Sequence, residues 1–372
     1  MGDRILFGLF LMFIVSAAIQ IFYYFYFYLS VVISKPPAKS ASLEPVSVII
    51  CARNEAGNLS EFLPSVLTQD YPDYEVIVVN DCSEDDTYKI LGDYLVRYPV
   101  LKVSTVNKDP KFTHSKKLAQ FIGIKAAKNE ILVFTDADCK PASDQWLRGI
   151  ASNFDEKTSY VLGYGGYIKR EGLLNAYIRY DTAFIAMQYI GMAIRGNPYM
   201  GVGRNMAYRK NEFFRNRGFG YHSSLVSGDD DLFVNNNATP ANTKVEYGAG
   251  TFTLSVPAST KEEWIKQKKR HLTTAPYYKP KDQFLLITEP VSRIIFYLSF
   301  IMLCSFKFMW IEVLAIFGAR LITQTTIFGL VQKKLEENGL IAYSIFFDIF
   351  SPLINGVLYI SKGKAQAKNQ WN

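Results

Sequence analysis

Residues 129–141 read NEILVFTDADCKP, and this stretch joins a buried strand to a pair of acids. The run ILVFT is typical of a strand covered on both faces. Asp136 and Asp138 follow it with only Ala137 between them. Because side chains alternate along an extended chain, both carboxylates face the same side. Two carboxylates so close repel each other unless a cation neutralises them, so the pair predicts a Mg²⁺ or Mn²⁺ site, with a solvated turn as the alternative.

Two earlier segments repeat this arrangement of a buried strand followed by polar residues. They are VSVIICARNE at 46–55 and YEVIVVNDCSEDDT at 74–87, and a shorter strand is expected at 101–107. Segments with helical spacing alternate with these strands, at 59–69, 86–97 and 115–128. This alternation predicts an α/β fold with a mainly parallel sheet covered by helices on both faces. Ligands of such sheets bind beyond the carboxyl ends of the strands.

Charged residues stand at the predicted strand ends in positions that suit a nucleotide. Glu55 and Asp81 end two neighbouring strands, and their carboxylates suit the hydroxyls of a ribose or the N–H of a base. Lys116 begins the helix that precedes the acid pair and suits a phosphate. Each residue alone also fits a turn, a cap or a solvated helix. Together with Asp136, they predict a nucleotide-binding pocket.

The composition indicates a chain with both soluble and membrane-embedded parts. Hydrophobic residues make up 49% of the 372 residues, while charged residues make up 20%. Residues 5–33 carry no charge, and this stretch exceeds the roughly 20 residues that cross a bilayer as a helix. A cleaved signal peptide is the alternative. Further apolar blocks at 294–331 and 340–361 predict two or three helices, the first block being either two spans or one span after an interfacial helix.

These features predict three regions. We expect an N-terminal transmembrane anchor at 1–38, a cytoplasmic catalytic domain at 39–283 and a C-terminal membrane region with a basic tail at 284–372. The Lys-rich connectors around the central region favour the cytoplasmic side of a membrane, such as a bacterial inner membrane. Three crossings with an interfacial helix near 285–305 would keep the basic tail on that side. The net charge of +7 indicates attraction to anionic membrane lipid and no nucleic-acid partner.

The four cysteines indicate neither a disulfide framework nor a zinc site. They stand at positions 51, 82, 139 and 304, without a C-x-x-C motif and without metal-ligand spacing to the three histidines. Three of them fall at or after predicted strand ends. We therefore expect reduced thiols.

The segments described so far resemble the large family of inverting nucleotide-sugar glycosyltransferases that includes cellulose, chitin and hyaluronan synthases. The likeness covers about residues 46–272, and the order and spacing of the segments match. The resemblance implies a GT-A-type, Rossmann-like mixed sheet with helices on both faces. It also implies a nucleotide-sugar donor, expected to be a UDP-sugar, and a divalent cation. In this family the nucleotide-contacting acid matches Asp81, and the metal-binding Asp-x-Asp matches Asp136 and Asp138.

Two downstream segments resemble the acceptor side of the same family. GVGRNMAYRKNEF at 201–213 resembles its acceptor-side segment, and SGDDDLF at 227–233 resembles the place of its catalytic base. By this match Asp230 is the base, and Asp229 binds the acceptor or the diphosphate. A base is needed because a sugar hydroxyl is a poor nucleophile until a positioned group takes its proton. The alternative is a helix N-terminus, whose dipole favours acids.

KQKKRH at 266–271 resembles the Gln-x-x-Arg-Trp motif of membrane-embedded polysaccharide synthases, with His271 in place of the tryptophan. Thr260 and Glu263 form a capping box just before it, which predicts a helix with Gln267 and Arg270 on one face. Arginine can hold a diphosphate with two hydrogen bonds, and glutamine can bond a sugar hydroxyl. The alternative is a basic helix lying on anionic headgroups.

The sequence therefore predicts a membrane-bound, inverting, metal-dependent glycosyltransferase. Its expected acceptor is lipid-linked or a glycan of the cell surface, because the anchor concentrates the enzyme where such an acceptor lies. A processive polysaccharide synthase is the alternative within the same class. A metal-dependent nucleotidyltransferase and a non-catalytic nucleotide-sugar-binding protein are the alternatives from other classes.

Overall fold

The computed structural model describes residues 2–35, 39–40, 42–107, 115–222, 225 and 227–362. Contacts divide the chain into two compact units. We call them the helical unit, which includes residues 2–34, 170–195 and 260–362, and the sheet unit, which includes residues 35–169 and 196–259. Residues 170–195 and 260–283 of the predicted region 39–283 belong to the helical unit.

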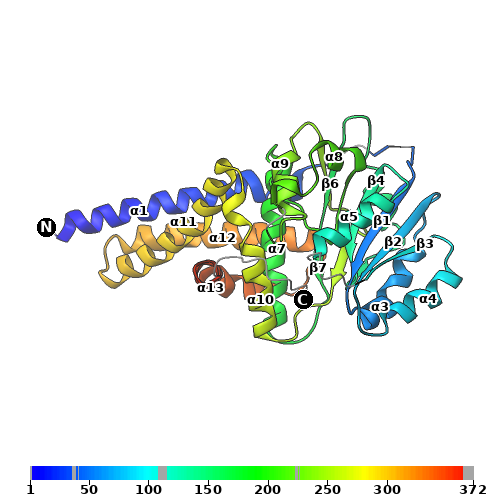
Figure 1. The fold of residues 1–372 in the computed structure, drawn as a ribbon. Coiled ribbons are helices and arrows are strands. Elements are labelled where there is room, and N and C mark those ends of the chain that lie inside the picture. Colours follow the sequence, from blue (N-terminus) through cyan, green and yellow to red (C-terminus); the bar gives the residue numbers. More distant parts are fainter. Residues whose placement is uncertain are drawn as a thin grey trace. The chain divides into compact units, whose positions relative to one another are not determined.

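The sheet unit is built around a seven-stranded mixed sheet in the order β3-β2-β1-β4-β8-β6-β9 (Figure 1). The first four strands pair in parallel, β8 runs antiparallel to both β4 and β6, and β9 is parallel to β6. This arrangement confirms the predicted α/β class with a mixed sheet. A second, three-stranded sheet has the order β5-β10-β7. The strands are β1 (Val46–Ala52), β2 (Tyr74–Asp81), β3 (Leu101–Val106), β4 (Ile131–Asp136), β5 (Cys139–Pro141), β6 (Tyr160–Gly163), β7 (Gly165–Tyr167), β8 (Met206–Arg209), β9 (Thr243–Glu246) and β10 (Thr253–Ser255).

Helices cover both faces of the larger sheet. Val48 and Ile50 of β1 pack in one apolar core with Leu63 of α3 and Trp146 of α6. Ile49 points to the opposite face, since side chains alternate along a strand, and lies beneath helix α5. The strands are therefore apolar on both sides, as their continuous apolar sequence predicts. The helices of this unit are α3 (Ala56–Leu67), α4 (Thr87–Arg97), α5 (Lys116–Ala126), α6 (Trp146–Ala151), α8 (Lys210–Arg215) and α9 (Asp231–Asn237), with a short 3₁₀ turn η2 (Gly220–His222).

Helix α5 approaches the sheet so closely that one position of it requires glycine. A Cβ atom on Gly123 would lie 2.8 Å from Cγ2 of Ile49 and 3.2 Å from Cγ2 of Val79. We expect Gly123→Ala to destabilise the protein by about 1–3 kcal/mol, because the added methyl group overpacks this contact. Gly92→Ala in α4 is the matched control, since a Cβ there meets no atom within 4 Å.

Gly92→Ala should stabilise the protein by about 0.5–1 kcal/mol, because alanine is more favourable than glycine in the interior of a helix. Thermal unfolding of the two full-length variants in detergent measures the difference. An unfolding temperature for Gly123→Ala equal to that of Gly92→Ala would contradict the close approach of α5.

The helical unit contains the long apolar segments. Four helices of the described chain are long and apolar enough to cross a membrane, and they cover Asp3–Ile33, Pro280–Ser305, Trp310–Lys334 and Ile341–Ser361. The apolar block 294–331 therefore belongs to two helices, and the segment near 285–305 has the length and composition of a span. The helices are α1 (Gly2–Phe22), α2 (Ser30–Ile33), α7 (Leu173–Ile194), α10 (Lys261–Leu272), α11 (Pro280–Ser305), α12 (Trp310–Lys334) and α13 (Ile341–Ser361), with a π-helical stretch η1 (Tyr23–Tyr28) and a 3₁₀ turn η3 (Ala275–Tyr277).

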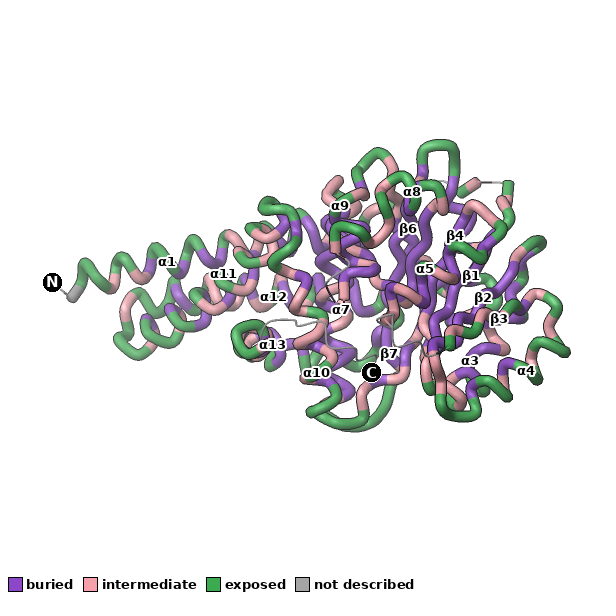
Figure 2. The backbone as a smooth tube through the Cα atoms, in the orientation of Figure 1, coloured by how far each residue is buried: buried purple, intermediate pink, exposed green. Residues whose placement is uncertain are grey.

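Burial differs between the two units (Figure 2). The strands of the larger sheet are buried along most of their length, whereas α1, α11 and α12 expose many side chains. Many of these exposed side chains are large and apolar, for example Phe7, Leu298 and Ile311. Such surface suits contact with lipid tails better than contact with water. The number and direction of the crossings remain predictions.

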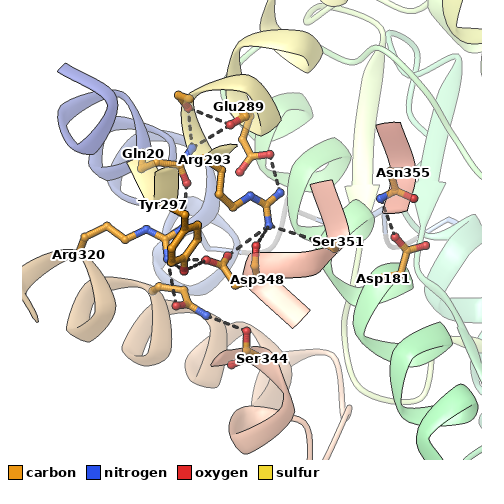
Figure 3. A network of polar contacts seen from close by, with 12 residues as sticks. Gln20, Asp181, Glu289, Arg293, Tyr297, Arg320, Ser344, Asp348, Ser351 and Asn355 are labelled. Atoms are coloured by element: carbon orange, nitrogen blue, oxygen red, sulfur yellow. Dashed lines mark hydrogen bonds and ion pairs between the residues drawn. The ribbon is translucent and has the colours of Figure 1, made fainter. Parts of the chain in front are cut away.

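A buried polar network joins four helices of the helical unit (Figure 3). Asp348 of α13 accepts hydrogen bonds from Arg293 of α11 and Arg320 of α12. Arg293 also donates to Glu289 at 2.8 Å, and Arg320 donates to Gln20 of α1 at 3.0 Å. None of these five residues is more than 3% exposed. The two arginines and the two acids balance in charge, so the network satisfies its charges internally.

Candidate functional site

The acid pair lies at the end of the fourth strand of the sequence. Asp136 is the last residue of β4, and Asp138 stands in the turn that leads to β5. Possible ligand atoms of Asp136, Asp138 and Cys139 all lie within 4.8 Å of one another. Carboxylate oxygens at this spacing suit a hard divalent cation such as Mg²⁺ or Mn²⁺. The thiol of Cys139 lies 3.0 Å from Oγ of Ser255, a contact that the sequence analysis did not predict.

The two carboxylates of this pair have different surroundings. Nζ of Lys116, at the first position of α5, lies 2.6 Å from Oδ1 of Asp136 and neutralises it. Burial, followed by the negative charge of Asp136, raises the pKa of Asp138 above its usual value. Asp136 therefore has a direct cationic partner in the chain, whereas burial and the charge of Asp136 disfavour the charged form of Asp138.

Glu55 and Asp81 follow two neighbouring strands, as predicted. Glu55 stands at the N-terminus of α3 and accepts a 2.6 Å hydrogen bond from Asn58. Burial, together with the charges of Asp138 and Asp136, raises the pKa of Glu55 to about 7 against the hydrogen bond from Asn58. Asp81 is the last residue of β2 and is fully buried. The structure thus places both acids at the carboxyl edge of the parallel strands, and their contacts with a nucleotide stay a prediction.

Asp230 is held by two backbone N–H groups. Its Oδ1 accepts from the N–H of Asp231 and its Oδ2 accepts from the N–H of Gly203, both at 2.7 Å. A Cβ atom on Gly203 would lie 3.2 Å from Oδ2 of Asp230, so a small residue suits this close approach. Asp230 also caps α9, so the helix N-terminus considered from the sequence is present here. Both features fix the direction of the Asp230 carboxylate.

The surroundings of Asp230 give it a basicity near neutral pH. Burial, followed by the charges of Asp229 and Asp231, raises the pKa of Asp230 to about 7 against the opposing charge of Lys116. A group with this pKa can take and return a proton near neutrality. The contribution of burial to the basicity of Asp230 was not foreseen from the sequence.

A pocket connects the acid pair to the acid triplet. Three residues predicted from the sequence line it, namely Lys116, Asp136 and Asp229. Asp138, Glu55, Asp81 and Asp230 are not part of this lining. The other residues that line the pocket were missed by the sequence analysis: Ile49, Cys51, Gln120, Phe134, Thr135 and Gly203. One signal was available, because Gln120 lies one helical turn after Lys116 and shares its face of the helix.

Gln267 and Arg270 lie on α10 of the helical unit. The predicted capping box is confirmed, because Thr260 accepts from the N–H of Glu263 and Glu263 accepts from the N–H of Thr260. Both Gln267 and Arg270 are partly exposed. Their contact with a diphosphate or an acceptor stays a prediction. Among the described residues, the four cysteines form no disulfide with one another.

Comparison with known proteins finds a family match for part of the chain. Residues 47–214 match the family Glycosyl transferase family 2. A similar relative is the glycosyltransferase AglE of Haloferax volcanii, with 35% identity over 116 residues, or 30% of this chain and 36% of the relative. Another is a poly-beta-1,6-N-acetyl-D-glucosamine synthase of Staphylococcus epidermidis, with 32% identity over 26% of this chain and 22% of the relative. The matches thus span about a third or less of the length of these relatives.

The fold has a match among solved structures. The mannosyltransferase PcManGT from Pyrobaculum calidifontis, solved with GDP-Man and Mn²⁺, superposes with a TM-score of 0.58. The match covers 94% of this chain and 99% of that chain at 17% identity, and at this identity it shows the fold alone. The mixed sheet described above is consistent with the GT-A fold that the sequence predicted. Residues 47–214 of this chain are therefore similar to glycosyl transferase family 2, and the fold of the chain is similar to that of a solved glycosyltransferase.

Proposed function

We propose that this protein is a membrane-bound, inverting glycosyltransferase that transfers a sugar from a UDP-sugar to a lipid-linked or glycan acceptor. The observation that carries the proposal is the pocket that connects the Lys116–Asp136 ion pair to Asp229, with Asp230 next in the chain. A transferase needs a place for the leaving diphosphate and a base on the other side of the sugar carbon. The ion pair serves the first need and the acid triplet serves the second.

The acid pair fits a divalent cation. Asp138 would be its main ligand, and Asp136 would assist through water or the nucleotide, because Lys116 already neutralises one Asp136 oxygen. Mg²⁺ or Mn²⁺ bound there would neutralise the charge that builds on the leaving diphosphate. Lys116 supplies positive charge at the same end of the pocket. Asp81 and Glu55 would bind the nucleoside beyond the diphosphate.

Asp230 acts on the acceptor. Its carboxylate, directed by the N–H groups of Gly203 and Asp231, takes the proton of the acceptor hydroxyl as that oxygen bonds to the anomeric carbon. The acceptor approaches from the face opposite the leaving diphosphate, so a single displacement inverts the anomeric configuration. Asp229 binds the acceptor or the diphosphate in this scheme. Gln267 and Arg270 of α10 would add contacts to the same two groups.

The helical unit supports an acceptor at the membrane. Four helices with the length and composition of membrane spans hold the enzyme at a lipid surface, and this raises the local concentration of a lipid-linked acceptor. We place the sheet unit on the cytoplasmic side, because the connectors around the central region are rich in lysine. A single transfer to a lipid-linked acceptor is our proposal, and a processive synthase would instead release a long polymer.

A donor panel assay tests the function. Membranes that contain the protein are incubated with Mn²⁺ and single UDP- or GDP-linked sugars, and the extracted lipids are analysed by mass. We expect one donor to release its nucleoside diphosphate, because the leaving group carries both phosphates. The same donor should add the mass of one hexose-type sugar to a lipid. Release of a sugar 1-phosphate, with transfer of the nucleoside monophosphate, would identify a nucleotidyltransferase and overturn the proposal.

Two variants sharpen this assay. Asp138→Asn should lower transfer by at least about 10²-fold, because it removes a carboxylate that would hold the cation. Asp144→Asn is the matched control, since Asp144 is an exposed aspartate outside the pocket. Unchanged transfer by Asp138→Asn would remove the metal site from the proposed mechanism.

A further inference from the structure

Helix α13 runs in a different direction from the other three candidate spans. Helices α1, α11 and α12 lie side by side along one direction, whereas α13 is seen almost along its own axis (Figure 1). Helices α1 and α11 meet over most of their length, since Phe13 stacks on Phe296 and Tyr23 donates a hydrogen bond to the carbonyl of Leu285. Helix α13 instead divides its contacts among α7, α10, α11 and α12. It therefore crosses the other spans and does not run along them.

The helical unit has two ends along the direction of these spans. At one end, which we call the turn end, Phe10 of α1 packs against Phe308 in the turn between α11 and α12. At the other end, which we call the α7 end, α7 packs against Tyr28 near the end of the first span and against Phe328 near the end of α12. The chain is joined to the sheet unit next to α2, α7 and α10, and both α2 and α10 contact α7.

Helix α13 begins at the α7 end. The N–H of Leu340, which caps α13, donates to Oε1 of Gln332 near the end of α12 at 2.9 Å. Phe347, two turns further along, packs against Tyr177 and Tyr180 of α7. Both contacts lie at the end of α12 that is remote from the turn.

Helix α13 also ends at the α7 end. Asn355 donates to Asp181 of α7 at 3.3 Å, and Lys362, just after the helix, donates to the carbonyl of Leu272, the last residue of α10, at 3.0 Å. Helix α10 is itself held to α7 by the 2.6 Å ion pair of Lys268 with Asp181. A helix of 21 residues is about 30 Å long, so α13 would reach the turn end if it ran along the bundle. Its second half contacts α7 and α10 instead.

The surface of α13 that faces away from its neighbours is apolar. Phe346, Phe350, Leu353 and Val357 share one helix face, and they are 64%, 52%, 48% and 65% exposed. We call these four residues the apolar stripe. The opposite face carries Asp348, which is buried in the polar network of Figure 3. An apolar stripe of this length requires a cover other than water. Lipid is the cover that the adjoining α11 and α12 already imply, because their own exposed side chains are large and apolar.

Lysines gather at the same end of the helical unit. Lys333 and Lys334 stand in the last turn of α12, and Lys362 follows α13. The sequence beyond Lys362 is also rich in lysine. Cationic side chains that flank an apolar helix face suit anionic headgroups, and they favour the cytoplasmic side of a membrane.

We propose that α13 lies in the membrane interface, parallel to the membrane plane, with the apolar stripe among the lipid tails and Lys362 at the headgroups. This inference rests on the membrane location in the proposed function. The chain then crosses the membrane three times, through the first span, α11 and α12, and its basic tail lies on the side of the sheet unit. The interfacial helix is thus at 341–361 and not near 285–305. Helix α10, bonded to Lys362 through Leu272, lies at the depth where a lipid-linked acceptor presents its polar part.

Depth measurements on the spin-labelled full-length protein in liposomes test this position. Cys82 and Cys304, the two thiols that are not buried, are replaced by serine, and a single cysteine is introduced as Phe346→Cys or Val357→Cys. A spanning α13 would separate the two labels by about 10–16 Å in depth, depending on its tilt. We expect their depths to agree to within about 5 Å, as on a helix that lies in the interface. Relaxation by oxygen and by a water-soluble nickel complex measures the depth.

Ile287→Cys and Leu298→Cys of α11 are the matched control. These two positions have the same separation in sequence as the α13 pair, and their side chains are 59% and 58% exposed. Their depths should differ by about 10–16 Å, because α11 crosses the membrane. Leu353→Cys, also on the apolar stripe, replaces either α13 variant if that variant does not reach the membrane.

Thiol labelling from the two sides of the membrane is an independent test. Asn338→Cys and Ser361→Cys place exposed thiols before and after α13, and Val96→Cys marks the sheet unit at a side chain that is 88% exposed. A membrane-impermeant maleimide is added to intact cells and to inside-out vesicles. We expect all three thiols to react from the same side, because α13 does not cross.

Each outcome decides the inference. A depth difference in α13 as large as that in α11, or opposite sides for Asn338→Cys and Ser361→Cys, would overturn it. Labels on the apolar stripe that are shielded from oxygen and nickel alike would show that a second copy of the chain covers α13 in place of lipid. None of these measurements requires sugar transfer, so a correctly placed but inactive protein would overturn the proposed function alone. A protein that does not insert into liposomes would overturn both.

Discussion

Replacing Asp230 by asparagine is expected to reduce sugar transfer by about 10²–10⁴-fold, the contribution of a positioned general base. The affinity for the nucleoside diphosphate should stay nearly unchanged, because Asp230 does not line the pocket at the diphosphate end. Asparagine has almost the same shape as aspartate but cannot accept the proton of an acceptor hydroxyl. Product formation, followed by mass analysis, and calorimetric binding of the nucleoside diphosphate measure the two effects.

Asp231→Asn is the matched control for Asp230→Asn. It removes one negative charge from the same triplet, but it leaves the carboxylate of Asp230, which accepts a hydrogen bond from the N–H of Gly203. We expect this variant to keep transfer within about tenfold of the wild type, since it retains the base. Full activity of Asp230→Asn, or equal losses in both variants, would show that the proton goes elsewhere.

The pH dependence of transfer gives a second readout for the same base. Burial and the charges of Asp229 and Asp231 raise the pKa of Asp230 to about 7. The base works only when it is deprotonated, so kcat/KM should fall as the pH drops below about 7 and level off above it. Removing the charge of Asp231 lowers the pKa of Asp230, so the fall should move to lower pH in Asp231→Asn. A profile that is flat between pH 5 and pH 8 would contradict the assignment.

Replacing Asp348 by asparagine is expected to destabilise the helical unit by about 3–5 kcal/mol, the usual cost of breaking a buried ion pair. Asp348 is the acid that Arg293 and Arg320 share, and all three side chains are at most 3% exposed. Asparagine leaves the network with two arginines and only Glu289 as a counter-charge. Arg320 is affected most, because its remaining partners are neutral: Gln20, Gln324 and Tyr297.

Loss of Asp348 should appear as a lower unfolding temperature of the full-length protein in detergent and a lower amount of protein in membranes. A compensating variant, Asp348→Asn with Arg320→Met, removes one charge of each sign and leaves the Arg293–Glu289 pair intact. We expect it to recover most of the lost stability, because it leaves no charge unpaired. If Asp348→Asn alone unfolds at the wild-type temperature, the network does not stabilise the assembly of these helices.

The sequence by itself determined the local elements and the chemistry at their ends. The apolar runs predict β1, β2 and β4, and the structure has them at Val46–Ala52, Tyr74–Asp81 and Ile131–Asp136. The Asp-x-Asp pair and the capping box of α10 were also visible, because both depend on residues within a few positions of one another. Such patterns report backbone preference and burial, which neighbouring residues impose directly.

Only the tertiary structure decided which distant residues meet. The N–H of Gly203 reaches Asp230 across 27 positions, and Arg320 meets Asp348 across 28. Gln120 looks like an ordinary helix residue in the sequence, and its unpaired Oε1 became visible once α5 lay against β1 and β2. Helix α7 likewise joined the helical unit from within the predicted catalytic region. The physical reason is that local sequence specifies which side of an element is buried, whereas the partner on that side depends on how all the elements pack.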